Sequence, residues 1–378
     1  MLLTEAQLAI RDSARAFARK ELVPHASEWD RTETTPLAVL DRMGELGLMG
    51  VFIPEEWGGA GADFVAYVAA MEEIAYGDAG ISNIMAVTNS PCAAALHSFG
   101  TQDQKERYLR PLASGKKRGC FLLSEPEAGS DAAKVKTRAV LQDGKYVVNG
   151  TKNFITAAES AHIGLLFATV DPSAGKDGIA CFIVDTKAPG FNIARRESKL
   201  GHRSCDTCQV IISDLELPTS ALVGRVGQGL KIALAGLGSG RISVAAQSVG
   251  VAQAAFDAAL AYAKGRMTFG KTLVEHQAIA FKLADMATKI QVARQAYLSS
   301  ALRRDHGLPF IEEASVAKLF ASEMVQSVTS DAIQIFGGYG YLNDYPVEKY
   351  FRDMRVFSIY DGTSEVQKML IARELLKK

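Results

Sequence analysis

The chain has 378 residues, which is enough for two or three domains and a sizeable apolar core. Lysine and arginine together number 42, and so do aspartate and glutamate, so the formal charge is zero. This balance lacks the basic excess of a nucleic-acid-binding surface, and we expect no nucleic-acid partner. The five cysteines are an odd number, which argues against a disulfide framework and favours a reducing compartment.

Residues 1–118 are predicted to form a first, helical domain. Thr4 and Gln7 have the spacing of a capping box, so a helix is expected from there to about Val23, just before Pro24. Further helices are predicted over residues 63–76 and 103–112. The first residues lack the basic and apolar segments of a signal peptide, and we see no apolar stretch close to the roughly 20 residues that span a bilayer. We therefore expect a soluble, cytoplasmic protein that has no membrane partner.

Residues 119–225 are predicted to form a β domain, a small barrel or sandwich. Short β-branched or aromatic runs follow one another over residues 146–148, 163–170, 179–184 and 209–212, with Asp-Gly and Pro-Gly turns between several of them. Cys205 and Cys208 have a metal-site spacing, and His202 lies upstream. A closed zinc site needs four ligands, so we interpret these residues as strand and turn and predict no metal.

Residues 226–378 are predicted to be helical again. Six apolar side chains follow a spacing of 4, 3, 4, 3 and 4, at Ile279, Leu283, Met286, Ile290, Ala293 and Tyr297. A stripe of this kind, kept for about five turns, is typical of a helix in an antiparallel bundle. The fold class predicted for the chain is therefore α+β.

The segment that is most informative about chemistry is the Asp361-Gly362 turn near the end of the chain. Aromatic residues precede it, and a helix-forming run from Ser364 to Leu376 follows it. Such a turn presents a carboxylate to a cavity beside the N–H groups of a helix N-terminus. An Asp-Gly pair before a helix is also a common turn or N-cap, so this segment alone leaves both interpretations open.

Six motifs along nearly the whole chain resemble, in order and spacing, those of the acyl-CoA dehydrogenase family of flavoenzymes. They are residues 54–61, 123–131, 149–156, 266–271, 334–340 and 351–367. The short-chain and branched-chain members are the most similar. The resemblance implies a helical domain over residues 1–118, a central β-barrel-like domain over 119–225 and a four-helix bundle over 226–378. It also implies a homotetramer, built as a dimer of dimers.

The resemblance implies FAD as the cofactor. The small-residue loop at residues 128–131 lets backbone approach phosphate oxygens, which suits a pyrophosphate. In relatives, residues that match Arg266 and Phe269 contact the pyrophosphate and adenosine, and the segment that matches 334–338 comes from a neighbouring subunit. Phe154 stands where some relatives carry Trp. The implied cofactor residues are Phe121, Leu123, Ser124, Gly129, Ser130, Phe154, Ile155, Thr156, Arg266, Phe269, His276, Gln277, Gln334, Gly337, Gly338, Thr363 and Glu365.

The resemblance further implies α,β-dehydrogenation of an acyl-CoA thioester. Asp361 matches the base that removes the α-proton, flavin N5 accepts the β-hydride, and an electron-transfer flavoprotein receives the electrons. The residues implied to contact the substrate are Ser130, Gly238, Gly240, Arg241, Tyr360 and Gly362.

Asp361 departs from the family pattern, because relatives usually carry Glu at this position. Some branches place the base where this chain has Gly240, so no second carboxylate replaces it. A shorter base leaves room at a substituted Cα, which favours short, branched or alicyclic acyl groups. Three alternatives stay open. They are a flavin oxidase with an Asp base that resembles nitroalkane oxidase, a non-catalytic flavin-binding homologue, and an enzyme for acyl-carrier-protein thioesters.

Overall fold

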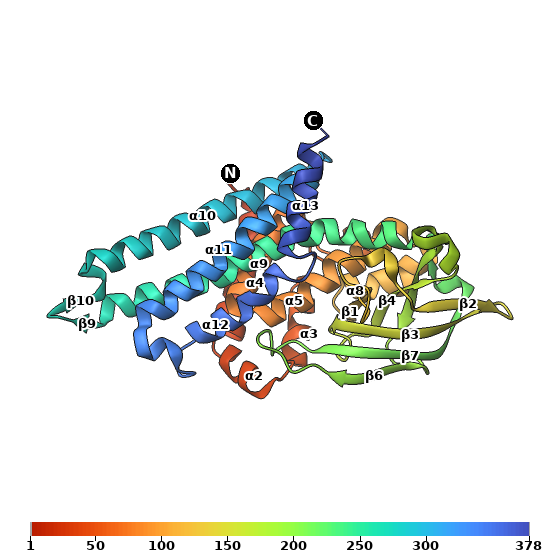
Figure 1. Cartoon of the computed structure of the whole chain (residues 1–378), viewed down its shortest axis with the longest axis horizontal. Helices are drawn as coiled ribbons and strands as arrows, with labels where there is room; N and C mark the ends of the chain where they lie inside the picture. The colour runs from red at the N-terminus through yellow and green to blue at the C-terminus, as the bar shows by residue number, and fades with distance from the viewer. Residues whose placement is uncertain (1, 378) are drawn as a thin grey trace.

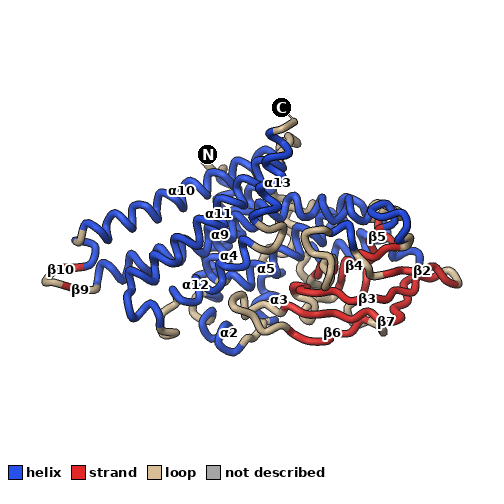
Figure 2. Tube along the Cα trace, in the orientation of Figure 1, coloured by secondary structure: helices blue, strands red, loops and turns tan. Residues whose placement is uncertain are grey.

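The structure is a computed structural model that describes residues 2–377. N-terminal helices, a β-sheet domain and a long C-terminal bundle follow one another along the chain (Figures 1 and 2). The sheet lies at one end of the long axis of the molecule, and the β9–β10 hairpin lies at the other (Figure 1). The predicted α+β order of helices, strands and helices is confirmed.

The N-terminal helices begin at the residues that the sequence indicates. Thr4 caps α1 (Glu5–Phe17) through a complete capping box with Gln7, and a π-helical turn extends this helix to Leu22. Asp63 caps α4 (Phe64–Gly77), which is apolar and buried on almost every side and therefore forms the centre of this domain. The remaining helices are α2 (Ala26–Thr32), α3 (Leu37–Glu45), α5 (Ala79–Val87), α6 (Ala94–Phe99), α7 (Gln102–Gln104) and α8 (Arg110–Ala113).

The middle domain is one barrel-like sheet with the strand order β6-β7-β3-β2-β4-β5-β8, and β1 pairs in parallel with β4. Its two antiparallel halves meet at a single residue pair, Arg138 of β2 and Thr169 of β4. The strand order begins at β6 and ends at β8, and these two strands do not pair, so the sheet is not closed. All four strand runs predicted from the sequence fall inside observed strands or at their ends. The strands are β1 (Gly119–Leu122), β2 (Arg138–Gln142), β3 (Lys145–Thr156), β4 (Ile163–Thr169), β5 (Ile179–Asp185), β6 (Phe191–Arg196), β7 (Thr207–Pro218) and β8 (Leu222–Val223).

The C-terminal domain consists of long helices that pack side by side. Of the predicted apolar stripe on α10, five side chains are buried and Ile279 is partly buried. The short hairpin of β9 (Met267–Thr268) and β10 (Lys271–Thr272) joins α9 to α10. The helices are α9 (Gly229–Gly265), α10 (Gln277–Asp305), α11 (Ile311–Phe336), α12 (Val347–Asp353) and α13 (Ser364–Leu375).

Helix α9 has 37 residues and is long and apolar enough to cross a membrane, by length and composition alone. The sequence expectation that no such stretch exists is therefore wrong for this helix. Its most apolar window is 67% buried inside the protein, because α4, α10 and α11 pack around it. The apolar composition of α9 is thus explained by its place at the centre of the fold.

A buried ion-pair cluster joins the three domains behind the C-terminal turn. The Lys349 ammonium on α12 donates to Asp78 Oδ2 at 3.0 Å and to Asp353 Oδ2 at 2.6 Å. From the β domain, the Ser204 hydroxyl donates to Asp78 at 2.5 Å, and the backbone N–H of His202 donates to Asp353 at 2.6 Å. These bonds fix the segment that leads to Asp361 against the other two domains.

Cys205 lies in a turn before β7, and Cys208 lies within this strand. All five cysteines are buried free thiols. Cys208 lies near Glu159 and Asp206, but the Asp206 carboxylate already accepts bonds from the N–H groups of Glu159 and Ser160 and from the Ser160 hydroxyl. This bonding is what the interpretation as strand and turn expects.

Candidate active site

Asp361 lies on a tight turn directly before α13. Asp361 and Gly362 both have left-handed backbone conformations, with φ values of 51° and 89°. A non-glycine residue is uncommon in this region, although aspartate tolerates it better than most. Thr363 then caps the helix, because its hydroxyl accepts a hydrogen bond from the Val366 N–H at 3.3 Å. The sequence signal for a turn and a helix start is thus correct, and the cap is Thr363 rather than Asp361.

The carboxylate of Asp361 faces Gly240 on α9. A Cβ atom added to Gly240 would lie 2.7 Å from Asp361 Oδ2, so only glycine leaves room at this point of the helix. Within residues 2–377 the carboxylate accepts no hydrogen bond and forms no ion pair. Burial raises the pKa of Asp361, and the charges of Lys318 and Arg241 oppose this rise. An unpaired carboxylate with a raised pKa has the chemistry of a proton acceptor.

Two buried side chains hold the backbone of the turn. The Lys318 ammonium on α11 donates to the Gly362 carbonyl at 2.8 Å. The Gln367 amide on α13 donates to the same carbonyl at 2.8 Å and to the Asp361 carbonyl at 3.3 Å. Both side chains are 0% exposed, so water does not compete for these bonds. Neither residue belongs to the set predicted from the sequence.

Tyr360 is held by a chain of hydrogen bonds that leads toward the β domain. Its hydroxyl donates to Gln247 Oε1 on α9 at 2.8 Å, and the Gln247 amide donates to the Ser82 hydroxyl at 2.9 Å. The next residue on α5, Asn83, donates to the Thr156 hydroxyl at the end of β3 at 3.4 Å. The predicted cofactor strand and the predicted base therefore face one another across α5.

The segments of the β domain that match flavin contacts are built on a buried ion pair. The Lys152 ammonium is 0% exposed and donates to Glu125 Oε1 at 2.7 Å, to the Leu123 carbonyl at 3.2 Å and to the Phe167 carbonyl at 2.6 Å. The Asn153 N–H donates to the Ser124 carbonyl at 2.9 Å. These bonds position the loop that follows β1.

Phe154 is turned outward by an irregularity in β3. Its φ is 60°, and the pairing of β3 with β7 shifts register between Lys152 and Ile155. The ring of Phe154 is 66% exposed, whereas Ile155 is buried. An exposed aromatic on a bulge beside the Leu123–Ser124 loop offers an apolar face to a planar ring system.

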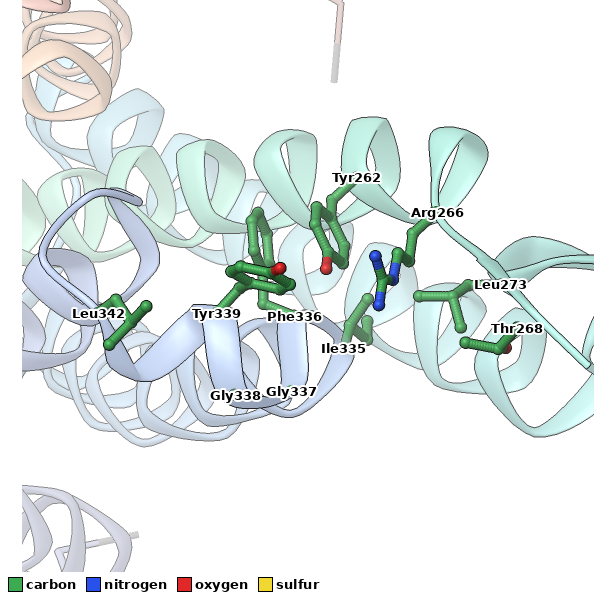
Figure 3. A pocket seen from close by; sticks show the side chains of 10 residues that line it. All are labelled: Tyr262, Arg266, Thr268, Leu273, Ile335, Phe336, Gly337, Gly338, Tyr339 and Leu342. Atoms are coloured by element: carbon green, nitrogen blue, oxygen red, sulfur yellow. The ribbon is translucent and has the colours of Figure 1, made fainter.

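A second group of predicted cofactor residues lies at the other end of the bundle. Figure 3 shows Arg266 beside Tyr262, Tyr339 and Leu273, at a cavity of about 420 Å³ that Gly337 and Gly338 also line. The Arg266 guanidinium lies 5.6 Å from the centre of the Tyr339 ring and has no carboxylate partner in the described part of the chain. Phe269, at the tip of the hairpin, is 98% exposed. The free guanidinium and the open glycine backbone fit the anionic charge of a pyrophosphate.

The structure thus separates the predicted residues into two sets. Asp361 lies with Gly240, Arg241, Tyr360 and Gly362 at the centre of the molecule, and the β-domain residues face this set across α5. The hairpin end of the bundle carries Arg266, Phe269, His276, Gln277, Gln334, Gly337 and Gly338. The hairpin and the sheet lie at opposite ends of the molecule, so the two sets do not meet within one chain (Figure 1).

Sequence reasoning missed the residues that support the site. They are Lys152, Gln247, Lys318 and Gln367, and each is 0% exposed. One signal was available for Lys318, because it interrupts the buried face of α11 between Ala314, Ala317 and Ala321. A lone lysine on an apolar helix face indicates a buried cation with a specific partner.

Three family models match this chain one after another, and all three describe domains of the same family. The sequence matches the acyl-CoA dehydrogenase N-terminal domain over residues 4–116, the middle domain over 120–215 and the C-terminal domain over 227–376. The mitochondrial short-chain specific acyl-CoA dehydrogenase of Bos taurus is 44% identical over 375 residues, which are 99% of this chain and 91% of that protein.

Two solved structures superpose on the whole chain. Butyryl-CoA dehydrogenase from Megasphaera elsdenii has a TM-score of 0.98 at 40% identity and covers 100% of this chain and 99% of its own. A structure described as an electron transferring flavoprotein of Acidaminococcus fermentans has a TM-score of 0.99 at 42% identity, with 100% of both chains covered. These relatives define an oxidoreductase. The chain belongs to the acyl-CoA dehydrogenase family and is close to its short-chain and butyryl-CoA members.

Proposed function

We propose that the protein is an FAD-dependent dehydrogenase that introduces an α,β double bond into a short, branched or alicyclic acyl-CoA thioester. The observation that carries this proposal is the Asp361 carboxylate, half-buried and unpaired opposite Gly240. In a family of oxidoreductases, a carboxylate in this state is suited to take a proton from the carbon beside a thioester carbonyl.

Asp361 takes the α-proton, and the C–H bond electrons pass to the carbon skeleton as the double bond forms. The raised pKa of Asp361 brings its basicity closer to working pH and strengthens it as an acceptor. Among residues 2–377 no acceptor is bonded to the backbone N–H of Asp361, which leaves this donor available to the thioester oxygen. FAD, when bound, would accept the hydride that leaves Cβ, which is two electrons and one proton.

The substrate class follows from the short side chain at position 361. Aspartate is one methylene shorter than glutamate, and its carboxylate approaches α9 where Gly240 adds no side chain. A substituent on Cα then occupies space that a longer base would fill. This favours branched or alicyclic acyl groups beside short straight ones, with CoA as the carrier that the relatives' names indicate.

FAD is proposed to bind between two chains. Phe121, Leu123, Ser124, Phe154 and the Asp361 turn suit the flavin end, and the unpaired Arg266 suits the pyrophosphate. Because the Arg266 set lies at the hairpin end of the bundle, away from the Asp361 turn and the β domain, we propose that a second copy supplies the Arg266 set to each flavin. The proposal therefore includes an obligate dimer, and a homotetramer as a dimer of such dimers.

The proposed electron acceptor is an electron-transfer flavoprotein, and the proposed location is the cytoplasm. A flavin oxidase on the same fold is the competing activity, and it is distinguished by rapid reoxidation of the reduced flavin in air. A non-catalytic homologue is distinguished by flavin that no thioester bleaches.

The deciding experiment is an anaerobic titration of the flavin-loaded protein with butyryl-, isobutyryl- and cyclohexanecarboxyl-CoA, followed at the visible flavin band. Bleaching by at least one thioester, with slow reoxidation in air, is the expected result. The same thioesters attached to acyl carrier protein serve as the comparison for the carrier. Bound flavin that none of these compounds bleaches would overturn the dehydrogenase assignment.

A further inference from the structure

Lys318 is a fully buried lysine whose ammonium contacts the turn that carries Asp361. It lies on α11 at 0% exposure, and its ammonium donates to the Gly362 carbonyl at 2.8 Å. Across the described ranges it forms no ion pair with a carboxylate. A buried ion without a close counter-ion is destabilising by several kcal/mol in typical proteins. A charge buried at this cost and bonded to the residue after Asp361 indicates a role in the site.

The ionisable groups that interact electrostatically with Asp361 come from four segments. Lys318 comes from α11, Arg241 from α9, Tyr67 from α4 and Tyr360 from the turn itself. Burial raises the pKa of both tyrosines, so both are neutral at physiological pH. The charged neighbours are therefore the two cations, which favour the ionised carboxylate against the effect of burial.

The two cations differ in what they contact. Arg241 is buried, and its Nε has no partner within residues 2–377, so it acts on Asp361 through its charge. Lys318 acts through its charge and also through a direct bond to the residue after Asp361. That bond fixes the carbonyl of Gly362 at the left-handed turn on which the direction of the Asp361 side chain depends.

We propose that Lys318 is the positioning residue of the base: its ammonium fixes the Asp361–Gly362 turn through the Gly362 carbonyl and places a positive charge at the turn that carries the Asp361 carboxylate. This inference rests on the proposed function, in which Asp361 is the base. It explains how an aspartate serves where a longer side chain is usual. A short side chain has less freedom to reach the α-carbon, so the position of its backbone matters more. A displacement of about 1 Å can lower the rate about a hundredfold.

The test compares Lys318→Met with Lys318→Gln. Met keeps the apolar stem and removes both the charge and the hydrogen bond, whereas Gln removes the charge and keeps a donor for Gly362. Lys368→Met on α13 is the matched control, because Lys368 is exposed and pairs only with Glu323 at 3.6 Å. Each variant is assayed for flavin content, for kcat and for the pH dependence of kcat/KM, with the thioester that reduces the parent protein.

Both Lys318 variants are expected to move the acid limb of kcat/KM upward by about one pH unit, since a nearby cation typically lowers a carboxylate pKa by about 1–3 units. Lys318→Met is also expected to lower kcat about 10- to 100-fold, and Lys318→Gln by less, because the turn keeps a donor. The control is expected to change neither quantity. A purely structural role would alter stability and flavin content and leave the acid limb in place.

Infrared difference spectra of the carboxyl band of Asp361, identified by its absence in Asp361→Asn, give a reading that does not require turnover. An unchanged titration of this band in Lys318→Gln, together with an unchanged acid limb, would overturn the role of Lys318. A parent protein whose flavin no thioester reduces would instead overturn the proposed function. The infrared titration separates these two failures, because it needs only the folded, flavin-loaded protein.

Discussion

Lys152 in the sheet and Lys318 in the bundle are both fully buried, and burial lowers the pKa of each lysine to about 8. Their partners differ. Lys152 donates to the Glu125 carboxylate and to two carbonyls, which uses all three of its N–H donors. Lys318 donates to one carbonyl and has no carboxylate bonded to it in the region described. The same residue type therefore serves as an internal support in one domain and, in our proposal, positions a reactive group in the other.

The largest expected effect concerns the carboxylate that Lys318 faces. Asp361→Asn is expected to lower the rate of flavin reduction about 10³- to 10⁴-fold, because a general base typically contributes about 10²–10⁴ and no second carboxylate lies at Gly240. Stopped-flow reduction by the thioester that bleaches the parent measures this loss. A variant that is reduced at the parental rate would show that the base lies elsewhere.

The second effect is on stability and concerns Lys152. Lys152→Met is expected to lower the free energy of unfolding by about 3 kcal/mol, because it leaves the buried Glu125 carboxylate without its ammonium partner. Lys136→Met is the control, since that lysine is exposed and pairs with the exposed Glu127. Chemical denaturation of the two variants and of Lys318→Met measures the contrast. Equal losses for Lys152→Met and Lys318→Met would break the distinction between the two lysines.

A smaller effect tests the contact between α9 and the base. Gly240→Ala is expected to lower kcat/KM about tenfold to a hundredfold, because the new Cβ would lie 2.7 Å from Asp361 Oδ2 and displace the carboxylate. Gly265→Ala is the matched control on the same helix, where an added Cβ meets no atom within 4 Å. Equal values of kcat/KM for Gly240→Ala and Gly265→Ala would contradict this expectation.

The smallest expected effect is a pH-dependent gain in stability. The pKa of Asp361 is raised in the folded state above its unfolded value of about 3.9, so the folded state binds this proton more tightly. The group therefore contributes stability at low pH, and this contribution is lost as pH rises through the folded pKa. Asp361→Asn should therefore be more stable than the parent at pH 7, with the difference vanishing near pH 4. A difference that does not depend on pH would contradict the raised pKa.

The elements of the fold were predictable because their signals are local. The capping box at Thr4, the helix predicted over residues 63–76 and the apolar stripe of α10 each depend on residues a few positions apart. The support of the site was not predictable in the same way. Gly362 and Lys318 are 44 residues apart in the sequence, and Tyr360 and Gln247 are 113 apart.

The sequence by itself determined the α+β order, the motifs of the family and the identity of the carboxylate that we propose as the base. The tertiary structure decided which groups surround that carboxylate. It placed a glycine of α9 against Asp361, a buried lysine of α11 on the next carbonyl, and the Arg266 set of predicted cofactor residues at the hairpin end of the bundle, apart from the Asp361 set. The physical reason is that pKa values and positions of side chains depend on burial and on contacts between distant segments, and these exist only once the helices have packed.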